Sequence, residues 1–166
     1  MRCALTHRSV DAEAGFPAGS TSYYARTRRE LTRLVVSRIT DQLVADLDGL
    51  VIPDRIDDAT AARIAGSFLK RLAGREDAQA ARFALLFELR DDEDLRVALT
   101  SADPVRGKLV ETAAAILHAI GVIDPEKNAV DFVGLVDSLL LYRTAEAGPL
   151  DTTRVLTAYL AGLERD

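Results

Sequence analysis

Apolar residues recur along this chain at intervals of three and four positions, and no stretch alternates apolar and polar residues in the manner of a strand. The pattern predicts a long helix over about 27–48, a short one over about 93–100, and further helices over about 57–72, 77–90, 103–120, 125–145 and 151–163. Two short helices come first, in the stretch that starts at Leu5. Glycine or proline falls in most of the gaps, where one helix ends or the next begins. We therefore expect an all-α protein.

Residues that favour helix ends and turns support this division. Thr6 is placed to cap the first short helix, and Thr27 with Glu30 three residues later forms a predicted capping box for the long helix. Gly15 is expected at a turn that needs a positive φ angle. Pro17 is expected at the start of the second short helix.

The predicted helix at 125–145 carries apolar residues almost all the way round. A helix that is apolar on two faces needs a second partner besides its own core. Two antiparallel helices that meet their copies across a two-fold axis would form a four-helix bundle. The candidates for this contact, on this helix and on the last one, are Phe132, Val136, Leu139, Leu140, Leu156, Tyr159, Leu160 and Leu163. Burial of the helix inside a single chain is the alternative.

The composition is that of a globular protein, with 48% hydrophobic and 28% charged residues in a chain of 166. This length allows a sizeable core but is short for two ordinary independent domains. Charges interrupt every apolar stretch, so we expect no membrane span, and we expect no secretory segment. The single cysteine, Cys3, excludes an internal disulfide and fits a reducing cytoplasm. We expect it to be a partly exposed thiol without a role.

Charge is distributed unevenly along the chain. Residues 1–39 hold seven arginines against three acidic residues, a balance of +4, so the whole-chain charge of −5 leaves −9 for residues 40–166. A basic end on an acidic body is typical of a protein that docks one end on phosphate, although a solvated basic face is the alternative. The charge pattern therefore divides the chain into a basic segment at 1–39 and an acidic body at 40–166.

The stretch from Leu5 to Leu31, LTHRSVDAEAGFPAGSTSYYARTRREL, is the most informative segment. It combines two short helices, a glycine turn, two tyrosines and flanking arginines. This composition is typical of a helix-turn-helix that enters the major groove of DNA. The alternative is a turn that joins two helices without any role in DNA binding.

This segment resembles the DNA-binding domain of the TetR family of bacterial transcriptional repressors, in the version seen in actinobacterial members. The matching positions, which span about a sixth of the chain, are Leu5, Thr6, Arg8, Ala14-Gly15, Gly19-Ser20, Tyr23-Tyr24, Arg28 and Leu31. The resemblance implies a DNA-binding head at 1–39 and a helical ligand-binding and dimerisation domain at 40–166. It implies a homodimeric repressor that pairs through its last two long helices. It also implies release from a palindromic operator when a small effector binds.

The resemblance assigns roles on double-stranded DNA to seven residues. They are Thr6 and Arg8 for phosphates, Ser20 and Thr21 for base edges, Tyr23 and Tyr24 for the sugar-phosphate backbone, and Arg28 for a phosphate at the start of the long helix. The tyrosine rings are expected to pack beneath their hydroxyls, and at least one of them is expected to serve mainly in core packing.

Two departures from the family pattern count against a fully competent head. Ala25 stands where family members usually carry an aromatic residue, and it is expected to leave a softer joint or a small cavity. The family also places an amphipathic helix ahead of the motif, whereas only Met1 to Ala4 precede Leu5 here. Either the chain is shortened relative to the gene product, or the protein has lost that helix.

The same resemblance implies a cavity for a small effector inside the body. The residues expected to surround it are Phe68, Leu72, Phe83, Leu86, Phe87, Leu117 and His118, with plain core packing as the alternative for each. We expect an apolar or aromatic ligand oriented by one polar group such as His118.

Catalytic chemistry has little support in this sequence. His7 and His118 are its two histidines, and no Ser-His-Asp order, glycine-rich phosphate loop or zinc spacing is present. His7 is expected to contact DNA or to be plainly exposed, and the acidic run at 91–94 is expected to be a solvated helix start without a metal. We predict no enzymatic activity and no cofactor. The alternative to a repressor is a dimeric helical ligand- or partner-binding protein with a vestigial DNA-binding head.

Overall fold

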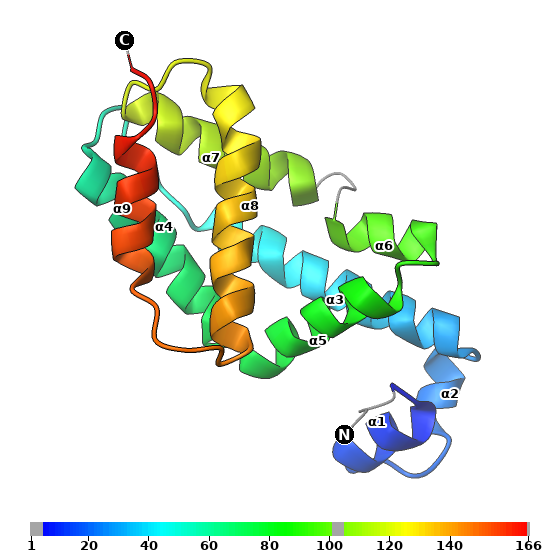
Figure 1. The fold of residues 1–166 in the computed structure, drawn as a ribbon. Coiled ribbons are helices and arrows are strands. Elements are labelled where there is room, and N and C mark those ends of the chain that lie inside the picture. The colour runs from blue at the N-terminus through cyan, green and yellow to red at the C-terminus, as the bar shows by residue number, and fades with distance from the viewer. Residues whose placement is uncertain (1–4, 101–104, 166) are drawn as a thin grey trace.

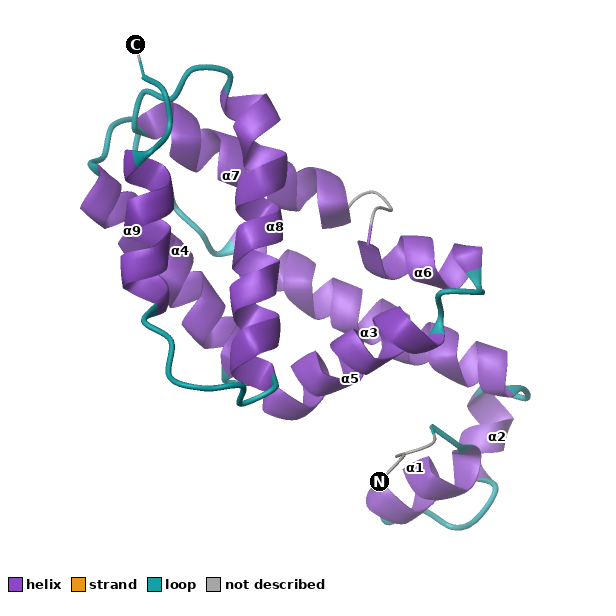
Figure 2. Ribbon diagram, viewed as in Figure 1, coloured by secondary structure: helices purple, strands orange, loops and turns teal. Residues whose placement is uncertain are grey.

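The computed structural model describes residues 5–100 and 105–165, and within them the chain is helical, as Figure 2 shows. The helices are α1 (His7–Glu13), α2 (Ser20–Tyr24), α3 (Arg28–Asp48), α4 (Asp58–Ala73), α5 (Glu76–Glu88), α6 (Glu93–Thr100), α7 (Val105–Ala119), α8 (Pro125–Thr144) and α9 (Thr152–Ala161). The extended backbone in this part of the chain includes one isolated bridge, between Val122 and Arg165. The prediction of an all-α fold is confirmed.

Several helices begin where the sequence predicts, because a side chain satisfies their free backbone N–H groups. Thr27 Oγ1 accepts a hydrogen bond from the N–H of Glu30 at 3.1 Å, and Glu30 Oε2 accepts one from the N–H of Thr27 at 3.1 Å. This pair is the predicted capping box of α3. Thr6 caps α1 in the same reciprocal manner with Ser9.

The turn between α1 and α2 differs from its prediction in one respect. Gly15 has the expected positive φ of 66°. Pro17, however, does not start a helix: its carbonyl accepts from the N–H of Ser20, and α2 begins at Ser20 after Gly19, whose φ is 94°. Gly19, with its left-handed backbone, therefore precedes the first residue of the second helix, where Pro17 was expected to start it. The predicted helix start at Asp103-Pro104 and the prediction for Cys3 lie outside the described residues.

The main apolar core lies among α4, α7, α8 and α9. Its most completely buried side chains are Leu69, Leu117, Leu140, Leu156 and Leu160. Full burial of a leucine contributes about 1.5–3 kcal/mol each. A second, smaller cluster joins α3 to α5 and α6, through residues such as Val36, Leu85 and Leu99. In Figure 1, α1 and α2 lie beside the start of α3 and apart from this body, so α3 is the element that connects the two.

The predicted interface residues lie mostly inside the single chain. Because α8 packs on α7 and α9 packs on α4, the residues buried within one copy are Phe132, Leu139, Leu140, Leu156 and Leu160. Their assignment to contacts with a second copy was therefore wrong.

The other three are only partly buried. Tyr159 stacks on the ring of Phe132 at 5.7 Å, Val136 lines a cavity described below, and Leu163 packs on the core. The outer face of α8 instead exposes Val130, Gly134, Ser138 and Leu141. Among the described residues, no helix combines the length and the apolar character needed to cross a bilayer.

Candidate functional site

Asp11 fixes the second helix of the head to the first. Its carboxylate, only 3% exposed, accepts hydrogen bonds from the N–H of Gly19 at 2.7 Å, from the N–H of Thr21 at 2.8 Å and from the Thr21 hydroxyl. The hydroxyl of Thr21 and these two N–H groups lower the pKa of Asp11, against the opposing effect of its burial. The start of α2 is therefore held by an ionised carboxylate.

A second link joins α1 to the residue that follows α2. His7 Nε2 lies 2.6 Å from the carbonyl oxygen of Ala25. The expectation of a plainly exposed side chain is wrong, because His7 is half-buried and makes this hydrogen bond, whereas a contact of His7 with DNA stays a prediction. Ala25 is buried despite its small side chain, and its carbonyl receives this polar contact from α1.

The two tyrosines of the motif point into solvent. Tyr23 is 84% exposed and Tyr24 is 78% exposed, and their rings meet edge to face with centroids 5.3 Å apart. The expectation that at least one ring packs in a core is therefore wrong. The helix that carries them, α2, has only five residues, and among the described residues it contributes to neither apolar cluster.

Among the other residues assigned to DNA, some side chains are exposed and others already make hydrogen bonds within the head. Arg8 is exposed, whereas the Thr6 side chain caps α1. The Ser20 hydroxyl donates to the carbonyl of Pro17 at 2.7 Å, and the Thr21 hydroxyl is held by Asp11. Their roles on DNA stay predictions.

The basic start of α3 is paired with acidic residues of the body, which the sequence did not reveal. Arg28 forms an ion pair with Glu88 at the end of α5. Arg29 bonds both Asp92, at 3.0 Å, and Asp94, at 3.0 Å. The hydrogen bonds from Arg29 lower the pKa of the Asp92 carboxyl. The acidic run at 91–94 therefore holds an arginine, and in the described residues no three His, Cys, Asp or Glu side chains converge in a possible metal site.

A cavity lies in the body between α3, α4, α5, α7 and α8. It holds about 810 Å³ of empty space, part of it open to solvent. Its lining includes Ile39, Gln42, Leu43, Leu47, Leu50, Ile64, Phe68, Leu72, Arg75, Gln79, Arg82, Leu109, Thr112, Ile116, Phe132, Val136 and Asp137. Five helices converge on it, so a molecule bound there would contact most of the body.

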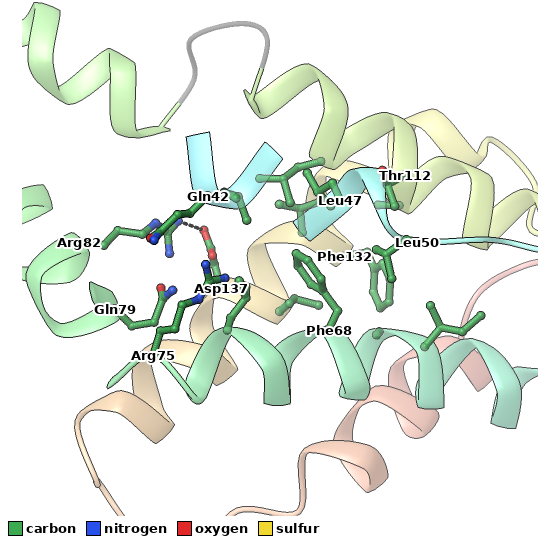
Figure 3. A pocket seen from close by; sticks show the side chains of 18 of the residues that line it. Gln42, Leu47, Leu50, Phe68, Arg75, Gln79, Arg82, Thr112, Phe132 and Asp137 are labelled. Atoms are coloured by element: carbon green, nitrogen blue, oxygen red, sulfur yellow. Dashed lines mark hydrogen bonds and ion pairs between the residues drawn. The ribbon is translucent and has the colours of Figure 1, made fainter. Parts of the chain in front are cut away.

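The two ends of this cavity differ in chemistry. Figure 3 shows Phe68 and Phe132 together toward one end, and Arg75, Gln79 and Arg82 gathered at the other. The apolar end is formed by α4 and α8 against Leu47 and Leu50. An amphipathic molecule could therefore place its apolar part at one end of the cavity and its polar part at the other.

Ion pairs engage both arginines at the polar end. Arg82, itself buried, donates to Asp137 Oδ2 at 2.9 Å, and its guanidinium lies 5.0 Å from the centroid of the Phe83 ring. Arg75 pairs with Asp46. Gln79 is only 6% exposed, and its Oε1 has no hydrogen-bond partner. A buried acceptor left without a donor costs about 1–3 kcal/mol, so Gln79 Oε1 is an unsatisfied acceptor in the described part of the cavity wall.

Of the seven residues expected around a cavity, Phe68 and Leu72 do line this one. Phe83 and Leu117 belong to the buried core, and Leu86 packs against it. Phe87 is 72% exposed and His118 is exposed as well, so placing these two at a cavity was wrong.

The reason for these errors is helical phase. Each residue advances about 100° around a helix, and α7 faces the cavity with Leu109, Thr112, Ala113 and Ile116. His118, two positions after Ile116, then points away. The polar lining was missed altogether, although one signal was available: Asp137 is a lone charge between Val136 and Ser138 in an otherwise apolar stretch.

Comparison with known proteins gives one finding that concerns the body. A family model described as the tetracyclin repressor-like C-terminal domain matches residues 56–166, about two thirds of the chain. The match begins just ahead of α4 and includes most of the cavity wall. No curated protein and no solved structure gave a significant match.

Proposed function

Because this chain belongs to the TetR family of transcriptional regulators, we propose that it is a DNA-binding repressor that leaves a palindromic operator when a small apolar or aromatic effector fills the cavity. The observation that carries this proposal is the course of α5. Its first half contributes Gln79 and Arg82 to the cavity, and its last residue, Glu88, pairs with Arg28 at the start of α3. One rigid element thus touches both the effector space and the head.

The proposed signal is a competition for arginine. In the free protein Glu88, Asp92 and Asp94 hold Arg28 and Arg29, so these carboxylates would compete with DNA phosphate for the two arginines. A filled cavity would shift α5 and the long α3, and so change how strongly the body holds these arginines. This is a two-state equilibrium biased at both ends, so effector and DNA must weaken each other's binding by the same factor.

On DNA, we assign the phosphate contacts to Arg8, Arg28 and the hydroxyls of Tyr23 and Tyr24, all of which are exposed. Ser20 opens α2 and would face the base edges. Thr21 keeps its hydroxyl on Asp11, which leaves its methyl group for a thymine methyl. Thr6 would add a contact from the start of α1.

We assign dimerisation to the outer faces of the last two helices. On α8 this face consists of Val130, Gly134, Ser138 and Leu141, with small residues in the middle that permit close approach of a second helix. Ala158 is exposed on the neighbouring α9. A two-fold pair would present two heads to two half-sites about one DNA turn apart, or a multiple of it.

Fluorescence anisotropy with labelled DNA flanking the protein's own gene tests this proposal. Both this chain and one extended upstream by the preceding codons are titrated, each over a range of salt concentrations. Tight binding with a steep salt dependence, reduced in Arg28→Ala, is the expected result. If neither chain binds, the repressor assignment fails.

The second candidate function is a dimeric ligand- or partner-binding protein whose head is vestigial. One observation favours it: in the described residues α1 and α2 are joined by hydrogen bonds at Asp11 and His7, and neither helix contributes to the two apolar clusters. Amide hydrogen exchange separates the two functions. A vestigial head would show little protection over residues 5–30 while the body stays protected.

A further inference from the structure

The polar end of the cavity carries chemical information about its ligand. Gln79 comes from the first half of α5 and is more than nine-tenths buried, with an Oε1 that receives no hydrogen bond. Figure 3 shows this side chain at the polar end, beside Arg75 and below Arg82. A carbonyl oxygen can only accept, so the group that satisfies it must be a donor.

The charge at this end argues against an ionised ligand. Arg82 is neutralised by Asp137 and Arg75 by Asp46, each in direct contact. A carboxylate ligand would have to compete with Asp137, whose side chain is 37% exposed, for the buried guanidinium of Arg82, whereas an ammonium would meet two arginines. An unpaired charge beside the buried Arg82 is costly.

The opposite end of the cavity is mostly apolar. Phe68 from α4 and Phe132 from α8 face it, with Leu47 and Leu50 closing the same end. The polar side chain at this end is Thr112, whose hydroxyl already donates to the carbonyl of Lys108 at 2.7 Å. A ligand body that reaches this end therefore meets mainly hydrocarbon.

We infer that the cavity selects an uncharged amphipathic molecule, with an apolar or aromatic body between Phe68 and Phe132 and a hydroxyl or amide N–H that donates to Gln79 Oε1. This inference rests on the proposed function, since it names the chemistry of the proposed effector. It assigns the orienting role to Gln79, in place of the exposed His118.

Four probes with the same phenylbutyl body and different ends test the inference: phenylbutanol, butylbenzene, phenylbutyrate and phenylbutylamine. Binding of each to the full chain is measured by titration calorimetry. Phenylbutanol should bind more tightly than each of the others by roughly fivefold or more, the size expected when a buried acceptor gains its donor. Equal affinity for butylbenzene, or tighter binding of either charged probe, would overturn the inference.

Gln79→Leu is the diagnostic variant, because it removes the acceptor and keeps the volume. It should bind phenylbutanol and butylbenzene with equal affinity, and Gln79→Met serves if the leucine variant does not fold. Asp77→Asn, an exposed change on the same helix, is the matched control and should keep the preference. A preference that survives both Gln79 changes would also overturn the inference.

The outcomes separate this inference from the proposed function. If none of the four probes binds, both the inference and the effector role of the cavity fail. If phenylbutanol is preferred through Gln79 but leaves DNA affinity unchanged, the inference stands and the proposed coupling to DNA fails.

Discussion

Glu88→Gln should increase the affinity of the protein for its operator. In the free protein Arg28 is paired with Glu88 through one guanidinium nitrogen, so the carboxylate competes with a phosphate for this side chain. The Arg28 side chain is 58% exposed and that of Glu88 is 49% exposed, so water screens the pair strongly. Such exposed pairs contribute about 0.2–1 kcal/mol. Removing the competitor should therefore lower the dissociation constant by a factor of about 1.4 to 5.

A double-mutant cycle isolates this effect. Anisotropy titrations with one labelled duplex at fixed salt compare the wild type, Glu88→Gln, Arg28→Ala and the double variant. Arg28→Ala should weaken binding and reduce the salt slope by about one. In that background Glu88→Gln should change nothing further, since the partner is gone.

Glu76→Gln provides the matched control. It removes the same charge at the opposite, exposed end of α5. If it raises DNA affinity as much as Glu88→Gln does, the gain is a general consequence of net charge. If Glu88→Gln leaves the affinity unchanged or weakens it, competition for Arg28 is refuted.

Three further predictions concern the head, the core and the outer face of α8. Hydrogen bonds lower the pKa of Asp11, so its stabilisation of the head is present above the ordinary carboxyl pKa of about 3.9 and is lost as pH falls through the lowered value. Amide exchange at Thr21 should show this loss in acid, and Asp11→Asn should show reduced protection at neutral pH too. Leu140→Ala, at a fully buried position, should lower the free energy of unfolding by about 2–5 kcal/mol in urea titrations; a change below 1 kcal/mol would contradict its place in the core. Ser138→Arg should halve the mass measured by analytical ultracentrifugation without lowering the melting temperature, whereas an unchanged mass would rule out this face of α8 as the dimer contact.

The sequence predicts the helices well, because their ends depend on neighbouring residues. The capping box of Thr27 and Glu30 and the positive φ of Gly15 are local effects of side-chain chemistry and glycine geometry. The start of α2 was misplaced because Gly19 and Pro17 both favour a helix entry, and only the backbone decides between them.

Contacts between helices are less predictable from one sequence. Periodicity shows that Leu140 and Leu156 lie on apolar faces, but it does not show whether the same chain or a second copy covers them. The pairing of Arg28 with Glu88 joins residues 60 positions apart, and charge type alone offers many other partners. Gln79 gave no signal, since a buried glutamine differs from an exposed one only in its surroundings.

The arginine pairs at the head also bear on how this regulator could change over generations. Arg28, Glu88 and Asp94 are all exposed, and replacing any of them disturbs no buried packing. Substitutions there can adjust the strength of the switch in small steps, while the core around Leu140 retains its sequence. The effector concentration at which DNA binding changes and the stability of the fold can then change independently during evolution. Closely similar chains with the same body could therefore respond to very different effector concentrations.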